Sequence, residues 1–169
     1  MNSVLTHPDL QEAEVRDAER KKRVCFVCTG NTCRSPMAEA YANDLAQKKG
    51  LLWEAHSAGL YAEELSPISQ NAVLALEKAG VEAVAGRDYR LHLAHTLTEK
   101  EAEDFDLLVG MTPHHAFEMT LRYPAMASRI VSMPQAIPDP FGMDESAYLA
   151  CLEEIQKGVR ALLFPEDAE

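Results

Sequence analysis

The feature that most constrains this chain is a short polar segment, Cys-Thr-Gly-Asn-Thr-Cys-Arg-Ser at residues 28–35, between an apolar run and a helical pattern. The apolar run, residues 24–27, is typical of a buried parallel strand. A helix is predicted directly after the segment, over residues 37–49. Strand, tight loop and helix N-terminus form a geometry in which backbone N–H groups converge on an anion. The sequence therefore predicts an anion-binding loop at the carboxyl end of the first strand.

Two side chains of this loop combine a nucleophile with an anion-binding group. Five residues separate Cys28 from Arg34, so a loop that closes on itself points both at one bound oxyanion. The helix dipole and Arg34 both favour the thiolate form of Cys28. The planar guanidinium of Arg34 offers a fork to two oxygens. We expect Ser35 to cap the helix and Pro36 to take its first position, where no N–H is needed.

The rest of the chain alternates predicted strands with predicted helices. Further strands are expected near residues 51–57, 105–111 and 129–133, and further helices over 66–79, a short stretch after 98, 112–123 and 144–163. This alternation implies an α/β fold, a single-domain doubly wound four-stranded parallel sheet flanked by helices. Ligands of such sheets bind beyond the carboxyl ends of the strands, which is where the loop at Cys28 lies.

Length and charge set the domain organisation and exclude several kinds of partner. The chain has 169 residues, which suits one domain, here residues 23–165 after a charged N-terminal extension of residues 1–22. Residues 9–20 have a weak surface-helix pattern. No apolar run approaches ~18 residues and no signal sequence fits, so no membrane association is expected. A net charge of -11 argues against nucleic acid and anionic membranes as partners.

The four cysteines indicate a reducing, cytoplasmic compartment. Cys25 and Cys28 are three residues apart on a strand and face opposite sides of it, which disfavours a zinc site or a redox Cys-x-x-Cys motif. Cys28 and Cys33, in contrast, lie in one small loop. A reversible disulfide between them is a way to protect the nucleophile from over-oxidation.

The continuous stretch of residues 24–40, with Cys-x5-Arg-Ser at its centre, resembles the phosphate loop of the low-molecular-weight protein phosphatases. The resemblance extends in outline to Phe164. It implies a hydrolase that acts on phosphorylated proteins and needs no metal or cofactor, with Cys28 and Arg34 as catalytic residues. The implied phosphate-binding residues are Thr29, Gly30, Asn31, Thr32, Cys33, Arg34 and Ser35.

A second motif, Ile-Pro-Asp-Pro-Phe-Gly at residues 137–142, carries the candidate acid. An Asp between two prolines is by itself typical of a turn. Expelling a leaving group from phosphorus needs a proton donor, however, and the resemblance places the general acid at Asp139. An anionic substrate is expected to keep this carboxyl protonated. Phe141 is the expected aromatic wall beside the substrate, with ordinary core packing as its alternative.

The resemblance also implies a two-step mechanism with a phosphocysteine on Cys28. Asp139 is the acid in the first step and activates water in the second, and Ser35 donates a hydrogen bond to the sulfur. By the same resemblance Asn31 holds the loop in a strained turn. Ser57 and His92 match positions that brace Asn31, although a purely structural role is the alternative for each. No role is assigned to His95, and His114 and His115 are expected on a helix surface.

Thr32 bears on which phosphorylated side chain is the substrate. Phosphotyrosine-specific members of the family usually carry a larger aliphatic residue there, whereas the protein-arginine phosphatases that resemble them carry Thr. The hydroxyl of Thr32 can hydrogen-bond the attacking water or a guanidinium, and ionised Asp139 can pair with that guanidinium. Asp-Pro-Phe-Gly also lacks the paired tyrosines common in tyrosine-specific relatives.

We therefore predict a protein phosphatase specific for phosphoarginine, with a protein-tyrosine phosphatase as the alternative. Two remote alternatives remain. An arsenate reductase needs further cysteines, and only Cys151 follows the loop. A non-catalytic anion-binding module is disfavoured because nucleophile, Arg and acid are all present.

Overall fold

The computed structural model describes residues 21–167. Most of the predicted extension, including the helix pattern at residues 9–20, lies outside the described residues. The first strand begins at Lys22, one residue before the predicted domain boundary.

Four parallel strands form the sheet, as predicted. They are β1 (Lys22–Cys28), β2 (Trp53–Gly59), β3 (Leu107–Gly110) and β4 (Ile130–Ser132), in the order β2-β1-β3-β4. β1 therefore has a neighbour on each side, and the chain leaves its carboxyl end at the point where the strand order reverses. This is the position where α/β sheets of this type bind ligands.

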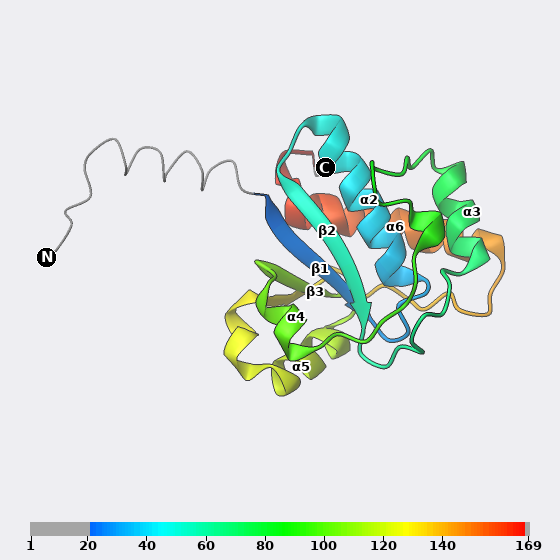
Figure 1. The fold of residues 1–169 in the computed structure, drawn as a ribbon. Helices are drawn as coiled ribbons and strands as arrows, with labels where there is room; N and C mark the ends of the chain where they lie inside the picture. The colour runs from blue at the N-terminus through cyan, green and yellow to red at the C-terminus, as the bar shows by residue number, and fades with distance from the viewer. Residues whose placement is uncertain (1–20, 168–169) are drawn as a thin grey trace, which may run out of the picture.

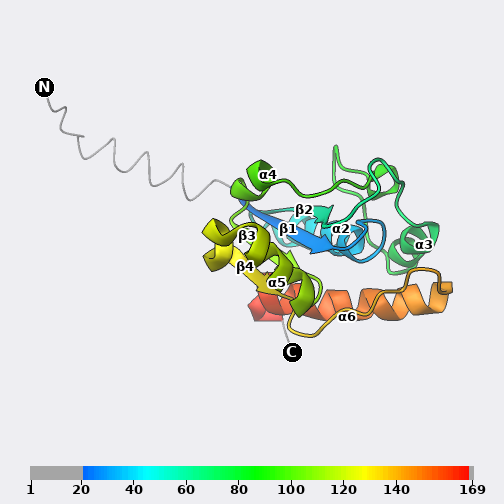
Figure 2. The same ribbon diagram turned by 90° about the horizontal axis from the view of Figure 1, so that it is seen from below.

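Helices cover both faces of the sheet (Figures 1 and 2). They are α2 (Arg34–Lys49), α3 (Gln70–Lys78), α4 (Glu99–Glu103), α5 (Pro113–Arg122) and α6 (Glu145–Leu163), with 3₁₀ turns at Tyr89–Leu91, Pro124–Arg129 and Pro165–Asp167. Figure 1 shows α2, α3 and α6 on one side and α4 and α5 on the other. Within residues 21–167 no helix is both long and apolar enough to cross a membrane.

The alternation of side chains along β1 divides the core in two. Phe26 and Cys28 face the larger cluster, which includes residues of α2, α3 and α6. Cys25 and Val27 face the smaller cluster with residues of α4 and α5. Each fully buried side chain of this size contributes about 2 kcal/mol by leaving water. The predicted separation of Cys25 and Cys28 onto opposite faces is confirmed.

The predicted start of α2 is wrong. The helix begins at Arg34, its N-cap is Cys33, and no side chain caps it. Ser35 does not act as the cap because it is the second helical residue, and its hydroxyl contacts the sulfur of Cys28 at 2.9 Å. Pro36 is the third helical residue, a position that also needs no N–H partner within the helix. The first amides of α2 therefore stay available to an anion.

Helix α3 begins at Gln70, later than predicted from Ser66. The preceding residues are held in an extended segment: Ser66 accepts a hydrogen bond from Ala94 N–H, and Ser69 N–H donates to the carbonyl of Thr32. Pairing with these two segments excludes a helical turn there. It also ties the phosphate loop to the start of α3.

Candidate active site

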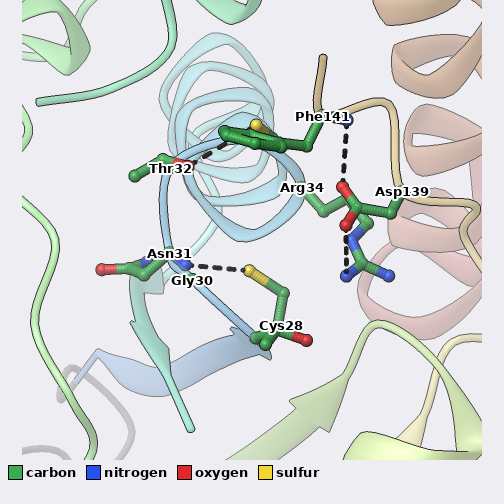
Figure 3. A pocket seen from close by; sticks show the side chains of 9 residues that line it. Cys28, Gly30, Asn31, Thr32, Arg34, Asp139 and Phe141 are labelled. Atoms are coloured by element: carbon green, nitrogen blue, oxygen red, sulfur yellow. Dashed lines mark hydrogen bonds and ion pairs between the residues drawn. The ribbon is translucent and has the colours of Figure 1, made fainter. Parts of the chain in front are cut away.

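The loop after β1 surrounds a pocket of about 220 Å³ (Figure 3). Its lining comes from the loop and from the segment before α6: Cys28, Thr29, Gly30, Asn31, Thr32, Cys33, Arg34, Asp139 and Phe141. The structure thus brings together the two motifs that are over 100 residues apart in the sequence. Figure 3 shows Cys28, Thr32, Arg34 and Asp139 arranged around this space.

The sulfur of Cys28 lies among hydrogen-bond donors. The backbone N–H of Asn31 donates to Sγ at 3.3 Å, and Ser35 Oγ lies 2.9 Å from it. Ser35 Oγ itself accepts from the side-chain amide of Asn31 at 2.9 Å, so its hydroxyl proton can be donated to the sulfur or to the carbonyl of Ala58, which is 3.4 Å away. Donors in this arrangement stabilise a negative charge on Cys28.

Asn31 is the buried centre of the loop and adopts a left-handed conformation, with φ of 58°. Its side-chain amide donates to Ser57 Oγ at 3.1 Å, and its carbonyl lies 2.9 Å from Nε2 of His92. Burial lowers the pKa of His92, which favours a neutral ring that donates from Nε2. The backbone N–H of His95 completes the set by donating to Asn31 Oδ1 at 3.1 Å. Together with the contacts to Ser35 and to the Cys28 sulfur, five hydrogen bonds hold a backbone conformation that is costly for a residue other than glycine.

Arg34 connects the phosphate loop to the segment that carries Asp139. Its guanidinium is buried; one nitrogen donates to the carbonyl of Ile137 at 3.0 Å and another lies 3.7 Å from Asp139 Oδ2. The side chain of Asp139 is 54% exposed, and its Oδ1 accepts the N–H of Phe141 at 3.1 Å. Phe141 is 72% exposed and lines the pocket, so it is not part of the core.

Cys33 contacts α6 as well as the loop. Its sulfur lies 3.2 Å from the hydroxyl of Tyr148, which also accepts from Ser69 Oγ at 3.0 Å. Burial and the bond to Cys33 raise the pKa of Tyr148 to about 12, so the phenol stays neutral. Cys28 and Cys33 are both free thiols here, and the disulfide between them stays a prediction.

Comparison with known proteins agrees with this geometry. The model of the low molecular weight phosphotyrosine protein phosphatase family matches residues 23–168. The chain belongs to that family. It is therefore a cysteine-dependent protein phosphatase.

The proteins similar to this phosphatase have names that denote different activities. A protein-arginine-phosphatase of Bacillus subtilis is 30% identical over 82% of the chain and 93% of the relative. An arsenate reductase of Brevibacillus brevis is 30% identical over 89% of the chain and 99% of the relative. The structure of a low molecular weight protein tyrosine phosphatase from T. tengcongensis has a TM-score of 0.77 at 36% identity, covering 85% and 98%. A mutant of the YwlE arginine phosphatase with a phosphorylated active-site serine has a TM-score of 0.75 at 29% identity, covering 83% and 92%.

The expectation that His115 lies on a helix surface is wrong. In this phosphatase the residue is only 4% exposed, and its Nε2 lies 2.9 Å from Thr29 Oγ1. Burial, and then the nearby charge of Arg34, lower the pKa of His115 to about 4. The neighbouring His114 is exposed as expected. A signal was available: α5 starts directly beyond the carboxyl end of β3, which places its first turn beside the phosphate loop.

Glu39 is a second residue of this phosphatase that the sequence patterns did not single out. It lies in α2 behind the loop, where its Oε1 accepts from Ser57 Oγ and from Arg87, both at 3.4 Å. Burial raises the pKa of Glu39 to about 7. Because Ser57 also accepts from Asn31, a continuous set of polar contacts links this carboxyl to the loop.

Proposed function

We propose that this phosphatase hydrolyses phosphoarginine on proteins through a phosphocysteine intermediate on Cys28. The observation that carries the substrate assignment is Thr32, which lines the pocket. Its hydroxyl makes a long contact of 3.6 Å to the Cys33 sulfur, so it is available to a polar substrate group. The 30% identical protein-arginine-phosphatase of Bacillus subtilis supports the same assignment.

In the first step the Cys28 thiolate attacks phosphorus opposite the P–N bond. The loop amides and Arg34 hold the three equatorial oxygens, which gain charge in the transition state. Asp139 gives its proton to the departing guanidinium nitrogen. The products of this step are a phosphocysteine, an unmodified arginine side chain and an ionised Asp139.

In the second step water attacks the phosphocysteine and Asp139 takes up a proton from that water. The S–P bond breaks and its electron pair returns to sulfur as the thiolate. Ser35, 2.9 Å from the sulfur, stabilises this leaving group. The phosphorylated active-site serine in the YwlE mutant supports a covalent phosphoenzyme in this family.

A phosphoarginine side chain carries several N–H donors, and unsatisfied donors are costly in a pocket. Thr32 offers a hydroxyl, and Asp139 is half exposed and offers a carboxylate after it has given up its proton. Arg34 neutralises the phosphoryl oxygens on the other side. An aliphatic side chain at position 32 offers the guanidinium no hydrogen-bond partner.

Phosphotyrosine hydrolysis is the alternative, and Phe141 favours it. Its exposed ring at the pocket suits contact with another aromatic ring, a preference worth about 1 kcal/mol. The structural similarity to the T. tengcongensis protein tyrosine phosphatase, with a TM-score of 0.77, supports the same alternative. Only the identity of the leaving group differs between the two candidates.

Two peptides of identical sequence, one with phosphoarginine and one with phosphotyrosine, decide between these substrates when kcat/KM is measured for each. We expect the larger value for phosphoarginine; a larger value for phosphotyrosine overturns the assignment. Thr32→Ile is expected to shift the ratio towards phosphotyrosine. Cys28→Ser is expected to abolish phosphate release while peptide binding persists, and unchanged release in that variant excludes the phosphocysteine route.

Arsenate reduction is a remote alternative, which the Brevibacillus brevis relative brings in. Cys151 is the candidate third cysteine. Burial raises the pKa of its thiol to about 12, and its sulfur contacts the carbonyl of Pro138. Both features disfavour attack by this thiol on another sulfur. A simple anion-binding module is disfavoured because a nucleophile, a cation and an acid share the pocket.

A further inference from the structure

Three side chains form a chain of hydrogen bonds that leads from the start of α5 to the phosphate pocket. Thr112 Oγ1 lies 2.9 Å from Nδ1 of His115, and Nε2 of the same ring lies 2.9 Å from Thr29 Oγ1. Thr29 follows the nucleophile directly and lines the pocket. The two-step mechanism above uses neither His115 nor the side chain of Thr29.

Both ring nitrogens of His115 contact a threonine hydroxyl, and the tautomer sets which group donates in each contact. Thr112 caps α5, and its oxygen accepts the backbone N–H of His115 at 3.3 Å. The hydroxyl proton of Thr112 is therefore free to point at Nδ1. Since the pKa of His115 is lowered to about 4, the ring carries one proton at neutral pH. In the tautomer with that proton on Nε2, the Thr112 hydroxyl donates to Nδ1. Nε2 then donates to Thr29, whose own hydroxyl proton is left for another acceptor.

We propose that His115 is a positioning residue that turns the Thr29 hydroxyl so that its proton points into the pocket and is donated to a phosphoryl oxygen. The inference rests on the proposed phosphate chemistry of this pocket, but not on which side chain carries the phosphate. Thr29 adds a side-chain donor to the loop amides and Arg34.

The energetic reason lies in the freedom of a hydroxyl rotor. An unsupported Thr hydroxyl in an exposed position exchanges between several orientations and water partners, and ordering it on binding has an entropic cost. A fixed hydrogen bond from Nε2 occupies one lone pair and removes most of this freedom. A hydrogen bond to an oxygen that gains charge is also stronger than a hydrogen bond between two neutral groups.

The test uses p-nitrophenyl phosphate as substrate and inorganic phosphate as competitive inhibitor, so that it does not depend on a preference for phosphoarginine. Thr29→Val removes the hydroxyl with little change in shape. We expect it to raise the Ki of phosphate and lower kcat/KM about tenfold, the usual size for one hydrogen bond to a charged group. Thr29→Ser keeps the hydroxyl and is expected to stay within about threefold of the wild type.

His115 is tested through its dependence on Thr29. His115→Met is expected to weaken phosphate binding about as much as Thr29→Val, whereas His115→Gln, with an amide N–H near the position of Nε2, is expected to restore most of the loss. The double variant Thr29→Val/His115→Met is expected to be no worse than Thr29→Val alone, because His115 acts through that hydroxyl. The exposed neighbour gives the matched control, His114→Met, expected to behave as the wild type.

Three outcomes overturn the inference. They are an unchanged Ki for Thr29→Val, additive losses in the double variant, or a His115→Gln variant as impaired as His115→Met at an equal melting temperature. Thr29 is exposed, so Thr29→Val keeps the test valid even if the His115 variants unfold. A preference for phosphotyrosine peptides overturns the proposed substrate and leaves this inference standing.

Discussion

The hydroxyl of Ser35 and the sulfur of Cys28 are 2.9 Å apart at the base of the pocket, although Ser35 is seven positions further along the chain. The same hydroxyl accepts from Asn31, so its proton can be donated to the sulfur, which is nearer than the carbonyl of Ala58 at 3.4 Å. The N-cap of α2 is Cys33, without a side-chain cap, and the hydroxyl of Ser35, the second helical residue, contacts the nucleophile instead. The contact affects the two chemical steps differently. A hydrogen-bond donor at sulfur stabilises the thiolate most when it leaves phosphorus in the second step.

Ser35→Ala is therefore expected to slow hydrolysis of the phosphocysteine more than its formation. Loss of one donor to a charged leaving group lowers kcat by about ten- to hundredfold. With p-nitrophenyl phosphate, rapid mixing is expected to reveal a burst of p-nitrophenolate of about one equivalent, followed by slow turnover. Wild-type kcat without a burst would contradict the assigned role.

Asp139→Asn is expected to reduce kcat by about 10² to 10⁴ on phosphopeptides, because the leaving nitrogen or oxygen loses its proton donor. The loss is expected to be smaller on p-nitrophenyl phosphate, whose leaving group departs without a proton. Asn keeps an oxygen for the N–H of Phe141, so the melting temperature is expected to change little. Glu153→Gln, on the exposed side of α6, is the control. Equal losses on both substrates would argue against Asp139 as the acid.

Glu39 is expected to make stability depend on pH. Its pKa is raised from 4.5 to about 7 in the folded chain, so between these values the unfolded state has released a proton that the folded state keeps. The free energy of unfolding therefore falls as pH rises from 4.5 to 7, by about 3 kcal/mol at 1.36 kcal/mol per pKa unit. Glu39→Gln lacks this contribution.

Urea unfolding of Glu39→Gln and the wild type at pH 5 and pH 8 checks this expectation. The variant is expected to gain stability relative to the wild type at pH 8, and the difference between the two proteins cancels the titration of other groups. If the difference is the same at both pH values, Glu39 does not titrate in this range.

We expect Gly59→Ala to destabilise the protein more than Gly30→Ala does, although Gly30 is the glycine within the phosphate loop. A Cβ on Gly59 lies 2.6 Å from the carbonyl oxygen of Thr29, whereas one on Gly30 has no atom within 4 Å. Gly59→Ala must displace the loop, which costs about 1–3 kcal/mol and weakens phosphate binding. Melting temperatures of the two Ala variants compare the sites directly; equal values would mean that the loop yields without strain.

Local patterns predicted the parts of this fold that depend on neighbours in sequence. Thr112-Pro113 is a local pattern for a helix start and Thr98-x-x-Glu101 a pattern for a capping box, and both were predicted from the sequence. Thr112 caps α5 as expected, and Thr98 accepts the N–H of Glu101 at 3.2 Å. The other half of that predicted capping box differs, because the carboxylate of Glu101 contacts His95 at 2.7 Å. The hydrogen-bond partner of a side chain at a helix end depends on which residues pack against that end, and a pattern within the helix does not specify those residues.

The candidate site was predictable where its residues share one segment, as in the loop from Cys28 to Arg34. For His115 the sequence indicated only that the first turn of α5 lies near the loop, and Glu39 had no such signal. Their contacts depend on the order β2-β1-β3-β4 and on which face of each helix meets the loop. Two histidines in sequence, His114 and His115, have no local difference that separates the exposed ring from the buried one. Only the packing of α5 against the loop does so.

The hydrogen bond from Arg34 to the carbonyl of Ile137 has a consequence for how the enzyme meets its substrate. The long side chain of Arg34 loses its rotational freedom when the protein folds, so an arriving phosphate finds the cation already aimed. Affinity for the phosphate is then expected to depend on how firmly the chain after β4 is anchored, at a residue that does not line the pocket.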